Sequence, residues 1–265
     1  MMTLRLLFLG DVVGRPGRRA VAAFLREFPA SERADFIVAN GENASGGKGI
    51  DPETAEELQD AGVDVITTGN HVWQKREIGP YLDETERVLR PVNMAPGVPG
   101  VGMTVRCTRR GQVPIGVVNV IGRVFMPPAD CPFRAAMAAV ESLRARAAVI
   151  LVDMHGEATS EKVAMGRYLD GRVSVVVGSH THVQTADEGV LPGGTAYLTD
   201  AGMCGPEDSV LGVRTDRVIA RFLTQLPTRF DVAAGPAIVQ GAIIDVDAAS
   251  GRATSIRRIR ERVGE

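Results

Sequence analysis

Short apolar runs alternate with amphipathic segments along the first third of the chain, which is the pattern of strands followed by helices. The predicted strands span residues 4–9, 35–39 and 63–68, and the predicted helices span residues 16–28 and 51–61. Asp51 and Pro52 have the residue types that favour a helix start, and Gly62 has the type that favours a helix end. This βαβαβ order predicts parallel strands joined by right-handed crossovers.

The pattern changes between about Val88 and Gly122, where proline and glycine separate the apolar runs. This stretch predicts mixed or antiparallel pairing. Further on, helices are expected over residues 132–146 and 157–169, and strands over 148–152, 173–177, 195–199, 217–223, 237–246 and 254–259. No repeat, linker or low-complexity tract interrupts the chain, so a single domain over residues 1–265 is expected.

Composition and charge narrow the class of protein. The chain is 45% apolar and 23% charged, which excludes disordered, collagen-like and coiled-coil proteins. Thirty basic and thirty-two acidic residues give a formal charge of −2, which argues against DNA or an anionic membrane as the main partner. The arginine-rich run that ends in Arg260 and Arg262 is interpreted as a charged edge strand rather than a basic patch.

The cysteines and the apolar runs indicate the compartment. Three widely spaced cysteines without a CxxC motif suggest neither a disulfide framework nor a zinc ribbon, so a reducing cytoplasm is expected. Asp11 ends the first apolar run too early for a signal peptide. Since no run reaches the 18 residues of a membrane span, no membrane association is expected.

Polar residues of the metal-binding type follow five predicted strands. They are Gly10-Asp11, Asn40-Gly41-Glu42-Asn43, Gly69-Asn70-His71, Asp153-Met154-His155 and Gly178-Ser179-His180-Thr181-His182. Glycines stand beside four of them, where they let the backbone turn and approach closely. All four histidines of the chain fall in these motifs. The sequence therefore predicts one convergent site at the strand ends.

Each element has an ordinary structural explanation when it is taken alone. Asp11 could be a helix cap, Asn70 a turn residue and His155 a hydrogen-bonded structural histidine. The pair His180 and His182 is more specific. In an extended segment residues two apart point to the same side, so both imidazoles are expected to face one metal.

Seven predicted ligands are too many for one four-coordinate ion and suit two ions that share a bridge. They are Asp11, Glu42, Asn43, Asn70, His155, His180 and His182. Mixed oxygen and nitrogen ligands without thiolate suit iron or manganese, with zinc as an alternative. Two divalent or trivalent transition-metal ions are therefore the expected cofactors. Such a centre generates hydroxide at neutral pH and suits hydrolysis of phosphate esters.

The order of these motifs resembles that of the calcineurin-like metallophosphoesterases, whose usual signature is DxH, GDxx, GNH(D/E), H and GHxH. Two departures are visible: Val13 stands where the first motif has histidine, and Glu42 stands where the family has a bridging Asp. These departures and the opening run from Phe8 to Arg18 are similar to the YmdB-like branch, described as bacterial cyclic-nucleotide phosphodiesterases.

The resemblance implies an α/β fold, a four-layer α/β/β/α sandwich with mixed sheets. It implies that Glu42 bridges two ions, with Asp11, Asn43 and His182 completing one site and Asn70, His155 and His180 completing the other. Asn43 is expected to offset the missing imidazole. His71 resembles the family histidine that protonates the leaving oxygen, a role that suits a group with a pKa near neutrality.

The expected function is hydrolysis of a 2′,3′-cyclic or 3′,5′-cyclic nucleotide by attack of a metal-bridging hydroxide, while His71 assists the leaving group. Two alternatives stay open, a metal-containing regulator that binds RNA or a nucleotide without turnover, and a metal-dependent ribonuclease. A small nucleotide is the expected partner, RNA is a possible one, and a homo-oligomer is expected.

Overall fold

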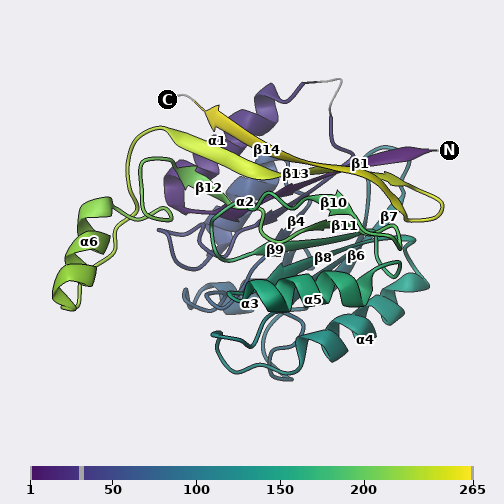
Figure 1. Ribbon diagram of the computed structural model, residues 1–265, viewed down its shortest axis with the longest axis horizontal. Coiled ribbons are helices and arrows are strands. Elements are labelled where there is room, and N and C mark those ends of the chain that lie inside the picture. Colours follow the sequence, from purple (N-terminus) through teal and green to yellow (C-terminus); the bar gives the residue numbers. More distant parts are fainter. Residues whose placement is uncertain (1, 30–32, 264–265) are drawn as a thin grey trace.

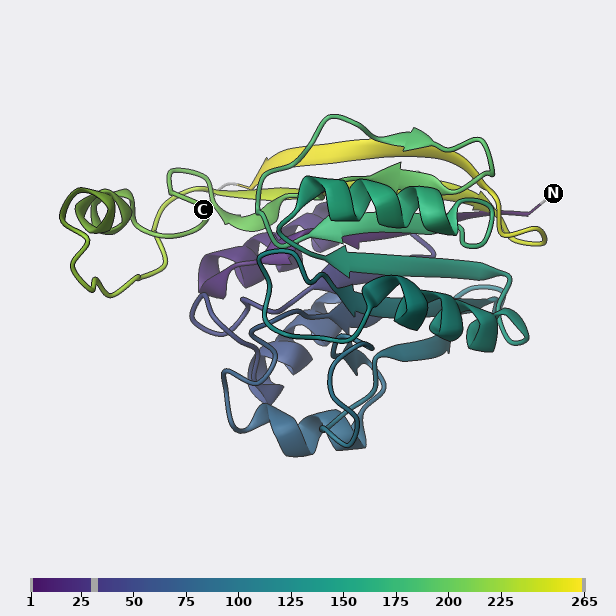
Figure 2. The ribbon, with the colours of Figure 1, turned by 60° about the horizontal axis from the view of Figure 1, so that its bottom comes forward.

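Two mixed β-sheets stack face to face, and helices cover the outer face of each (Figures 1 and 2). The computed structural model describes residues 2–29 and 33–263. The first sheet has the strand order β2-β12-β13-β1-β3-β4-β5, and β14 pairs with β13. Its strands are β1 (Thr3–Leu9), β2 (Asp11–Val12), β3 (Phe36–Asn40), β4 (Val65–Thr67), β5 (Val88–Leu89), β12 (Met203–Pro206), β13 (Ala237–Asp247) and β14 (Ala253–Val263).

The second sheet has the order β10-β11-β9-β8-β7-β6. Its strands are β6 (Met103–Cys107), β7 (Pro114–Ile121), β8 (Val149–His155), β9 (Val175–Ser179), β10 (Gly189–Val190) and β11 (Ala196–Leu198). The predicted parallel pairing of β1, β3 and β4 is confirmed. The antiparallel pairing expected after Val88 is found between β6 and β7.

The side-chain alternation of β1 shows how the layers form. Leu4, Leu6 and Phe8 belong to the apolar core between the sheets, where they meet residues of β7, β8 and β9. Leu7 and Leu9 point to the other side, into a core shared with helices. Because successive side chains of a strand point to opposite faces, a strand covered on both faces is apolar throughout.

Helices close the sandwich on both sides. They are α1 (Gly14–Glu27), α2 (Pro52–Ala61), α3 (Ile78–Glu84), α4 (Pro132–Arg144) and α5 (Thr159–Leu169). The first three contribute to the core on the first sheet, and α4 and α5 to the core on the second. The predicted α/β/β/α fold class is thereby confirmed. Among the described residues no helix is long and apolar enough to cross a bilayer.

The start of α2 follows the prediction. Asp51 accepts a hydrogen bond from the Thr54 backbone at 2.9 Å, and the Thr54 hydroxyl bonds back to the Asp51 backbone. Gly62 ends the helix in the left-handed conformation, at φ 118°. Side chains and backbone thus satisfy the free groups at both ends.

The strand expected over residues 217–223 is wrong, because the chain forms the helix α6 (Thr215–Thr224) there. Val218, Ile219, Phe222 and Leu223 recur at intervals of one and three residues, which is helical spacing rather than alternation. The helix projects away from the two sheets (Figure 1). Phe222 and Leu223 are 81% and 80% exposed, so these two apolar residues face solvent, whereas Val218 is buried.

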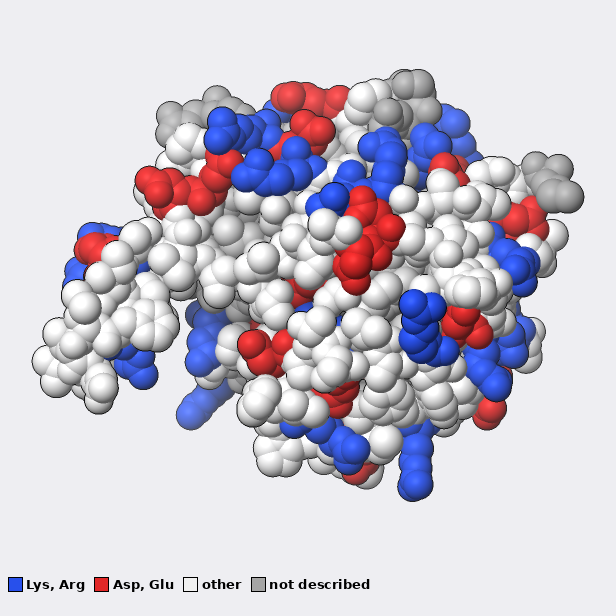
Figure 3. Space-filling view, viewed as in Figure 1, with Lys and Arg blue, Asp and Glu red and all other residues white. Residues whose placement is uncertain are grey.

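The C-terminal arginines lie on β14, as expected for a charged edge strand. Arg258 pairs with Glu188 at 2.7 Å, and Arg260 and Arg262 pair with Glu207 at 2.8 and 2.7 Å. Figure 3 shows basic and acidic side chains interspersed on the face in view, without one continuous basic surface.

Candidate metal centre

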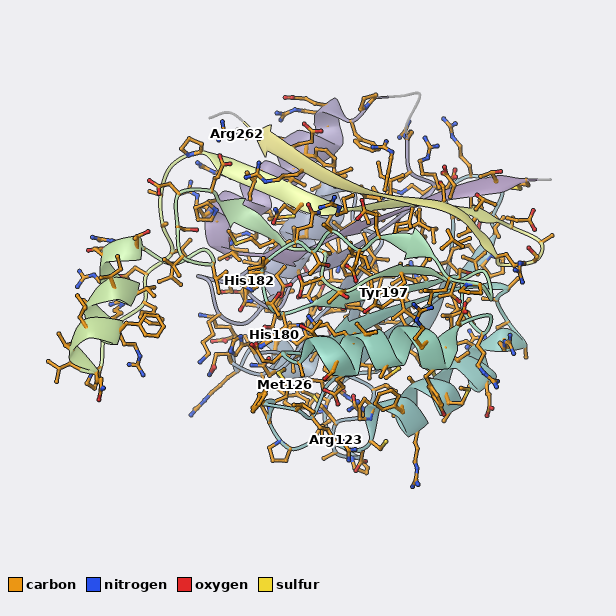
Figure 4. The ribbon with its side chains drawn as sticks, viewed as in Figure 1. Arg123, Met126, His180, His182, Tyr197 and Arg262 are labelled. Atoms are coloured by element: carbon orange, nitrogen blue, oxygen red, sulfur yellow. The ribbon has the colours of Figure 1, made fainter. Side chains whose placement is uncertain are left out.

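The seven predicted ligands and His71 meet where strands of both sheets end. Asp11 follows β1, Glu42 and Asn43 follow β3, and Asn70 and His71 follow β4 in the first sheet. His155 ends β8, and His180 and His182 follow β9 in the second sheet. Figure 4 shows His180 and His182 at the side of the sandwich toward α6. The convergence that the motif order predicts is therefore present.

Glu42 lies at the middle of the cluster and is fully buried. Its Oε1 atom is 3.3 Å from His155 Nε2 and accepts a hydrogen bond from Asn43 Nδ2 at 3.3 Å. Its Oε2 atom accepts one from the His71 backbone at 3.1 Å. A single carboxylate thus touches residues of both proposed ion sites.

One half of the cluster consists of Asn70, His155 and His180. His155 Nε2 is 3.2 Å from Asn70 Oδ1 and 3.0 Å from His180 Nδ1. Ligand atoms of Glu42, His155 and His180 all lie within 4.8 Å of one another, a spacing that could hold a metal ion.

The other half consists of Asp11, Asn43 and His182. His182 Nε2 is 3.6 Å from Asp11 Oδ1 and 3.1 Å from Asn43 Nδ2. Asp11 Oδ2 accepts a hydrogen bond from the His180 backbone at 3.0 Å, which joins this half to the first.

The geometric reason given for the histidine pair is wrong, although both imidazoles reach the cluster. The strand β9 ends at Ser179, and His180 and His182 have φ angles of 96° and 63°. The segment is therefore not extended, and the two rings reach different halves of the cluster. Left-handed backbone at residues other than glycine is uncommon and occurs often at functional sites.

The absence of a side chain at Gly69 lets His155 and Glu42 approach each other. A Cβ atom at this position would collide with the His155 ring and with Glu42 Oε2. Any side chain here would displace one ligand of each sheet, so the glycine of this motif has a packing role.

The charges of the buried groups are strongly coupled. Burial opposes ionisation of Glu42, but His155 and His71 outweigh it and hold the Glu42 pKa well below its usual range. Burial likewise opposes the charge on His182, but the Asp11 carboxylate raises the His182 pKa to about 9. Burial and the neighbouring His155 lower the pKa of His180 to about 4. Protons on His155 and His182 therefore balance the two carboxylates, and a metal ion would replace them.

Hydrogen bonds behind the rings direct nitrogen lone pairs into the cluster. His182 Nδ1 donates to the Leu211 carbonyl at 3.0 Å, so its Nε2 faces Asp11. His180 Nε2 is 3.2 Å from Glu157, so its Nδ1 faces His155. Partners of this kind fix the tautomer of metal-binding histidines.

Two buried side chains, Ser179 and Asp153, support His155 from behind. Ser179 Oγ is 2.9 Å from His155 Nδ1 and donates to Asp153 Oδ1 at 2.6 Å. Asp153 also accepts from Thr67 at 2.5 Å and from Asn40 at 3.1 Å. Burial raises the pKa of Asp153 to about 6. An Nδ1–H held by Ser179 leaves Nε2 of His155 directed at Glu42 and Asn70.

A buried ion pair supports the loop that carries His180 and His182. Lys162 Nζ lies 2.6 Å from Asp200 and donates to the Ser179 carbonyl at 2.7 Å; both side chains are 1% exposed. Asp200 also accepts from the backbone and hydroxyl of Thr181 at 3.1 and 2.8 Å. The residue between the two histidines is thus held by a charged group.

The atoms of the cluster fit cations. Asp11 Oδ1 is buried and has no hydrogen-bond donor among the described residues. It lies 3.6 Å from Nε2 of His182, so a bound cation would take the place of the proton that the Asp11 carboxylate keeps on this ring. Asn43 Nδ2 lies between Glu42 and His182, and rotation of the amide would place Oδ1 there, as a ligand requires. Carboxylate, amide and imidazole acceptors without thiolate suit iron, manganese or zinc.

Sequence reasoning missed several supporting residues. Lys162, Ser179 and Asp200 were not among the predicted site residues, nor were Asp153 and Glu157. Asp153 and Ser179 lie within the quoted motifs, so their adjacency to His155 and His180 was the available signal. Nothing in the local sequence links Lys162 to Asp200, because 38 residues separate them.

The chain matches the sequence model of the YmdB-like protein family over residues 7–259. It is 45% identical over 256 residues to a 2′,3′-cyclic-nucleotide 2′-phosphodiesterase of Bacillus subtilis (strain 168), covering 97% of this chain and 96% of that protein.

Two solved structures share the fold along almost the whole chain. A hypothetical protein from Thermus thermophilus is 42% identical with a TM-score of 0.90, covering 98% of this chain and 99% of that one. A novel phosphatase of Mycoplasma pneumoniae is 32% identical with a TM-score of 0.91, covering 99% of this chain and 94% of that one.

Proposed function

The chain belongs to the YmdB-like protein family, a branch of the calcineurin-like metallophosphoesterases, and on that premise we propose that it hydrolyses 2′,3′-cyclic nucleotides with two metal ions. It is a metal-dependent phosphodiesterase. The substrate class follows the name of the Bacillus subtilis relative, which shares 45% of its residues over nearly the full length. Hydrolysis of 3′,5′-cyclic AMP is the activity to compare with hydrolysis of 2′,3′-cyclic AMP.

The position of Glu42 carries the proposal. Oε1 of its buried carboxylate is 3.3 Å from both His155 Nε2 and Asn43 Nδ2, one residue from each half of the cluster. Asn70, His155 and His180 would hold one ion, Asp11, Asn43 and His182 the second, and Glu42 both. When bound, the ions supply Lewis acidity toward the phosphate and lower the pKa of water. Iron or manganese is the proposed metal, with zinc as the alternative.

His71 is the proposed proton donor to the leaving oxygen. Its Nδ1 atom is 3.0 Å from Asn43 Oδ1 and 3.2 Å from Glu42 Oε1, so that nitrogen is held against the ligand cluster. The side chain is 27% exposed, which leaves Nε2 free to meet a substrate. A proton held at Nε2 passes to O2′ as the phosphorus–O2′ bond breaks.

The test uses Glu42→Gln and His71→Ala, with Glu141→Gln on the surface of α4 as the control. Glu42→Gln is expected to lower both bound metal and hydrolysis of 2′,3′-cyclic AMP. His71→Ala is expected to keep the metal and lose roughly 100-fold or more in kcat, the scale of general acid catalysis. Purified protein without transition metal, or full activity in both variants, would exclude the proposal.

RNA stays an alternative substrate or ligand. The arginines of β14 would be its docking surface, and three of them, Arg258, Arg260 and Arg262, are already paired with glutamates. Competition between short RNA and 2′,3′-cyclic AMP distinguishes a nuclease, and binding of RNA without turnover distinguishes a regulator. Steep salt dependence would accompany such binding.

We also propose that the protein acts as a homo-oligomer in the cytoplasm. The exposed apolar residues Phe222, Leu223 and Leu226 on and beside α6 support self-association, because adjacent exposed apolar side chains mark interaction surfaces. Phe222→Ser with Leu223→Ser is expected to give monomers in light scattering; an unchanged mass would exclude this surface.

A further inference from the structure

The loop after β7, residues 122–126, leaves the second sheet directly beside the metal centre. β7 and β8 pair in register up to Ile121 and His155. The Gly122 backbone donates to the His155 carbonyl at 2.9 Å. Figure 4 shows Met126 and Arg123 on the same side of the molecule as His180. The loop therefore begins next to a candidate ligand of the metal centre.

A buried carboxylate fixes the backbone of this loop. Glu161 on α5 is 8% exposed and accepts hydrogen bonds from the Arg123 backbone at 3.1 Å and the Val124 backbone at 3.3 Å. Glu157, four residues earlier, contacts His180. The loop and the ligand loop are thus held by the same segment of chain.

Phe125 has an unusual conformation for its residue type. The Met126 backbone donates to the Arg123 carbonyl at 3.5 Å, which makes Phe125 the third residue of a four-residue turn. Its φ of 61° is one that glycine or asparagine normally supplies at this position. The ring is 87% exposed, so no packing within the described residues compensates for the backbone.

Two features without a structural benefit among the described residues therefore coincide at Phe125, in the loop that begins beside His155. A single exposed aromatic residue is ordinary on a protein surface. A bulky residue held at positive φ is not, and such residues cluster at active sites and ligand clamps. The ring presents a flat apolar face, the surface on which nucleobases stack regardless of their identity.

We infer that Phe125 is a stacking platform for the base of the nucleotide substrate, with Glu161 holding the platform in place. The inference rests on the proposed cyclic-nucleotide substrate and adds a base-binding site to it. A platform of this kind contributes to KM rather than to the chemical step and accepts both purines and pyrimidines.

The test compares Phe125→Gly with Gln112→Gly. Both residues have positive φ in exposed positions, and Gln112 lies in the turn between β6 and β7. Both variants relieve backbone strain and are expected to melt no lower than the wild type. Phe125→Gly is expected to raise KM for 2′,3′-cyclic AMP roughly five- to 100-fold, since stacking has that scale. Gln112→Gly is expected to leave KM unchanged, and Phe125→Trp to restore it.

A substrate without a base separates stacking from other effects. Methyl riboside 2′,3′-cyclic phosphate keeps the cyclic ester, and its KM is expected to be equal in wild type and Phe125→Gly. The quenching by AMP of Phe125→Trp fluorescence beyond that of the wild type, whose one tryptophan is Trp73, provides a readout that needs no turnover. Equal KM for 2′,3′-cyclic AMP in wild type and Phe125→Gly, or AMP without quenching, would overturn the platform. Failure of the wild type to hydrolyse any cyclic nucleotide, with AMP still quenching, would overturn the proposed reaction and leave the platform standing.

Discussion

The two halves of the ligand cluster are supported differently. In the half formed by Asn70, His155 and His180, the buried pair Ser179 and Asp153 supports His155 from behind. In the other half, His182 is oriented by the Leu211 carbonyl in the segment that leads to α6. His155 is thus held by buried side chains, whereas His182 depends on a peripheral segment.

The difference concerns preorganisation. Groups held by packed strands and buried hydrogen bonds keep their geometry without a ligand, whereas groups on loops open at lower cost. Glu42 belongs to both halves, so it transmits the order of the first half to the second. We therefore expect the Asn70, His155 and His180 half to bind its ion more tightly.

The strongest test of this comparison removes one candidate ligand from one half at a time and compares the two variants. Both His155→Ala and His182→Ala are expected to lower hydrolysis by more than about 100-fold, the upper end for residues that only support ligands. His182→Ala is expected to keep about one ion per chain, and His155→Ala less than one. Elemental analysis of the purified variants measures this. The same metal content in both variants would remove the distinction between the halves.

A smaller effect is expected from the support behind His155. Asp153→Asn keeps the shape and loses the charge that orients Ser179, and a loss of roughly 10- to 100-fold in metal affinity is expected. Because Asp153 touches only the first half, one of two binding steps should weaken in a titration of the metal-free protein. Equal weakening of both steps would show that the halves are not independent.

The ion pair below the histidine loop should affect both halves, since His180 and His182 flank Thr181. Asp200→Asn leaves the buried Lys162 ammonium without an anionic partner, and a destabilisation of about 3–5 kcal/mol is expected. Lys162→Met is expected to cost less, because Asp200 keeps its bonds from Thr181 and Gly202. Denaturant unfolding measures both.

Asp216→Asn in the exposed Arg214–Asp216 pair is the control and is expected to change little. Destabilisation of Lys162→Met beyond that of Asp200→Asn would contradict the assigned roles. Loss of metal from both halves at unchanged stability would show that the pair acts on the loop rather than on the fold as a whole.

The sequence predicted the convergence of the candidate ligands better than it predicted their supports, for physical reasons. Asp11, Glu42 and His155 follow strands whose apolar pattern is strong, and the ends of parallel strands meet at one edge. The positive φ angles of His180 and His182 could not be read from local residues, since neither is glycine. They depend on hydrogen bonds to residues distant in sequence, such as Asp11 and Asp200.

The error at α6 has a related origin. Its four apolar residues were taken for a buried strand, although their spacing is helical. Apolar character normally marks burial, and here Phe222 is exposed. A residue pattern indicates which face of an element is apolar. Whether that face is buried depends on how the other elements are arranged around it.

The smallest expected effect is on the pH dependence of folding stability in the metal-free protein, which differs between the two halves of the cluster. The His182 pKa is raised to about 9, so the folded state holds more protons than the unfolded state above the ordinary pKa near 6.5, and stability falls as pH rises toward 9. The His180 pKa is lowered to about 4, so stability falls as pH drops from 6.5 toward 4.

The free energy of unfolding of chelator-treated protein, measured between pH 4 and 9, is expected to show both losses of stability, an acid limb and an alkaline limb. His182→Gln should reduce the alkaline limb and leave the share of His155, whose pKa is also raised, and His180→Gln should reduce the acid limb. Bound metal should flatten the alkaline limb, because it takes the place of the protons on both histidines. An alkaline limb of unchanged size in His182→Gln would assign that proton elsewhere and weaken the case that Asp11 and His182 form one ion site.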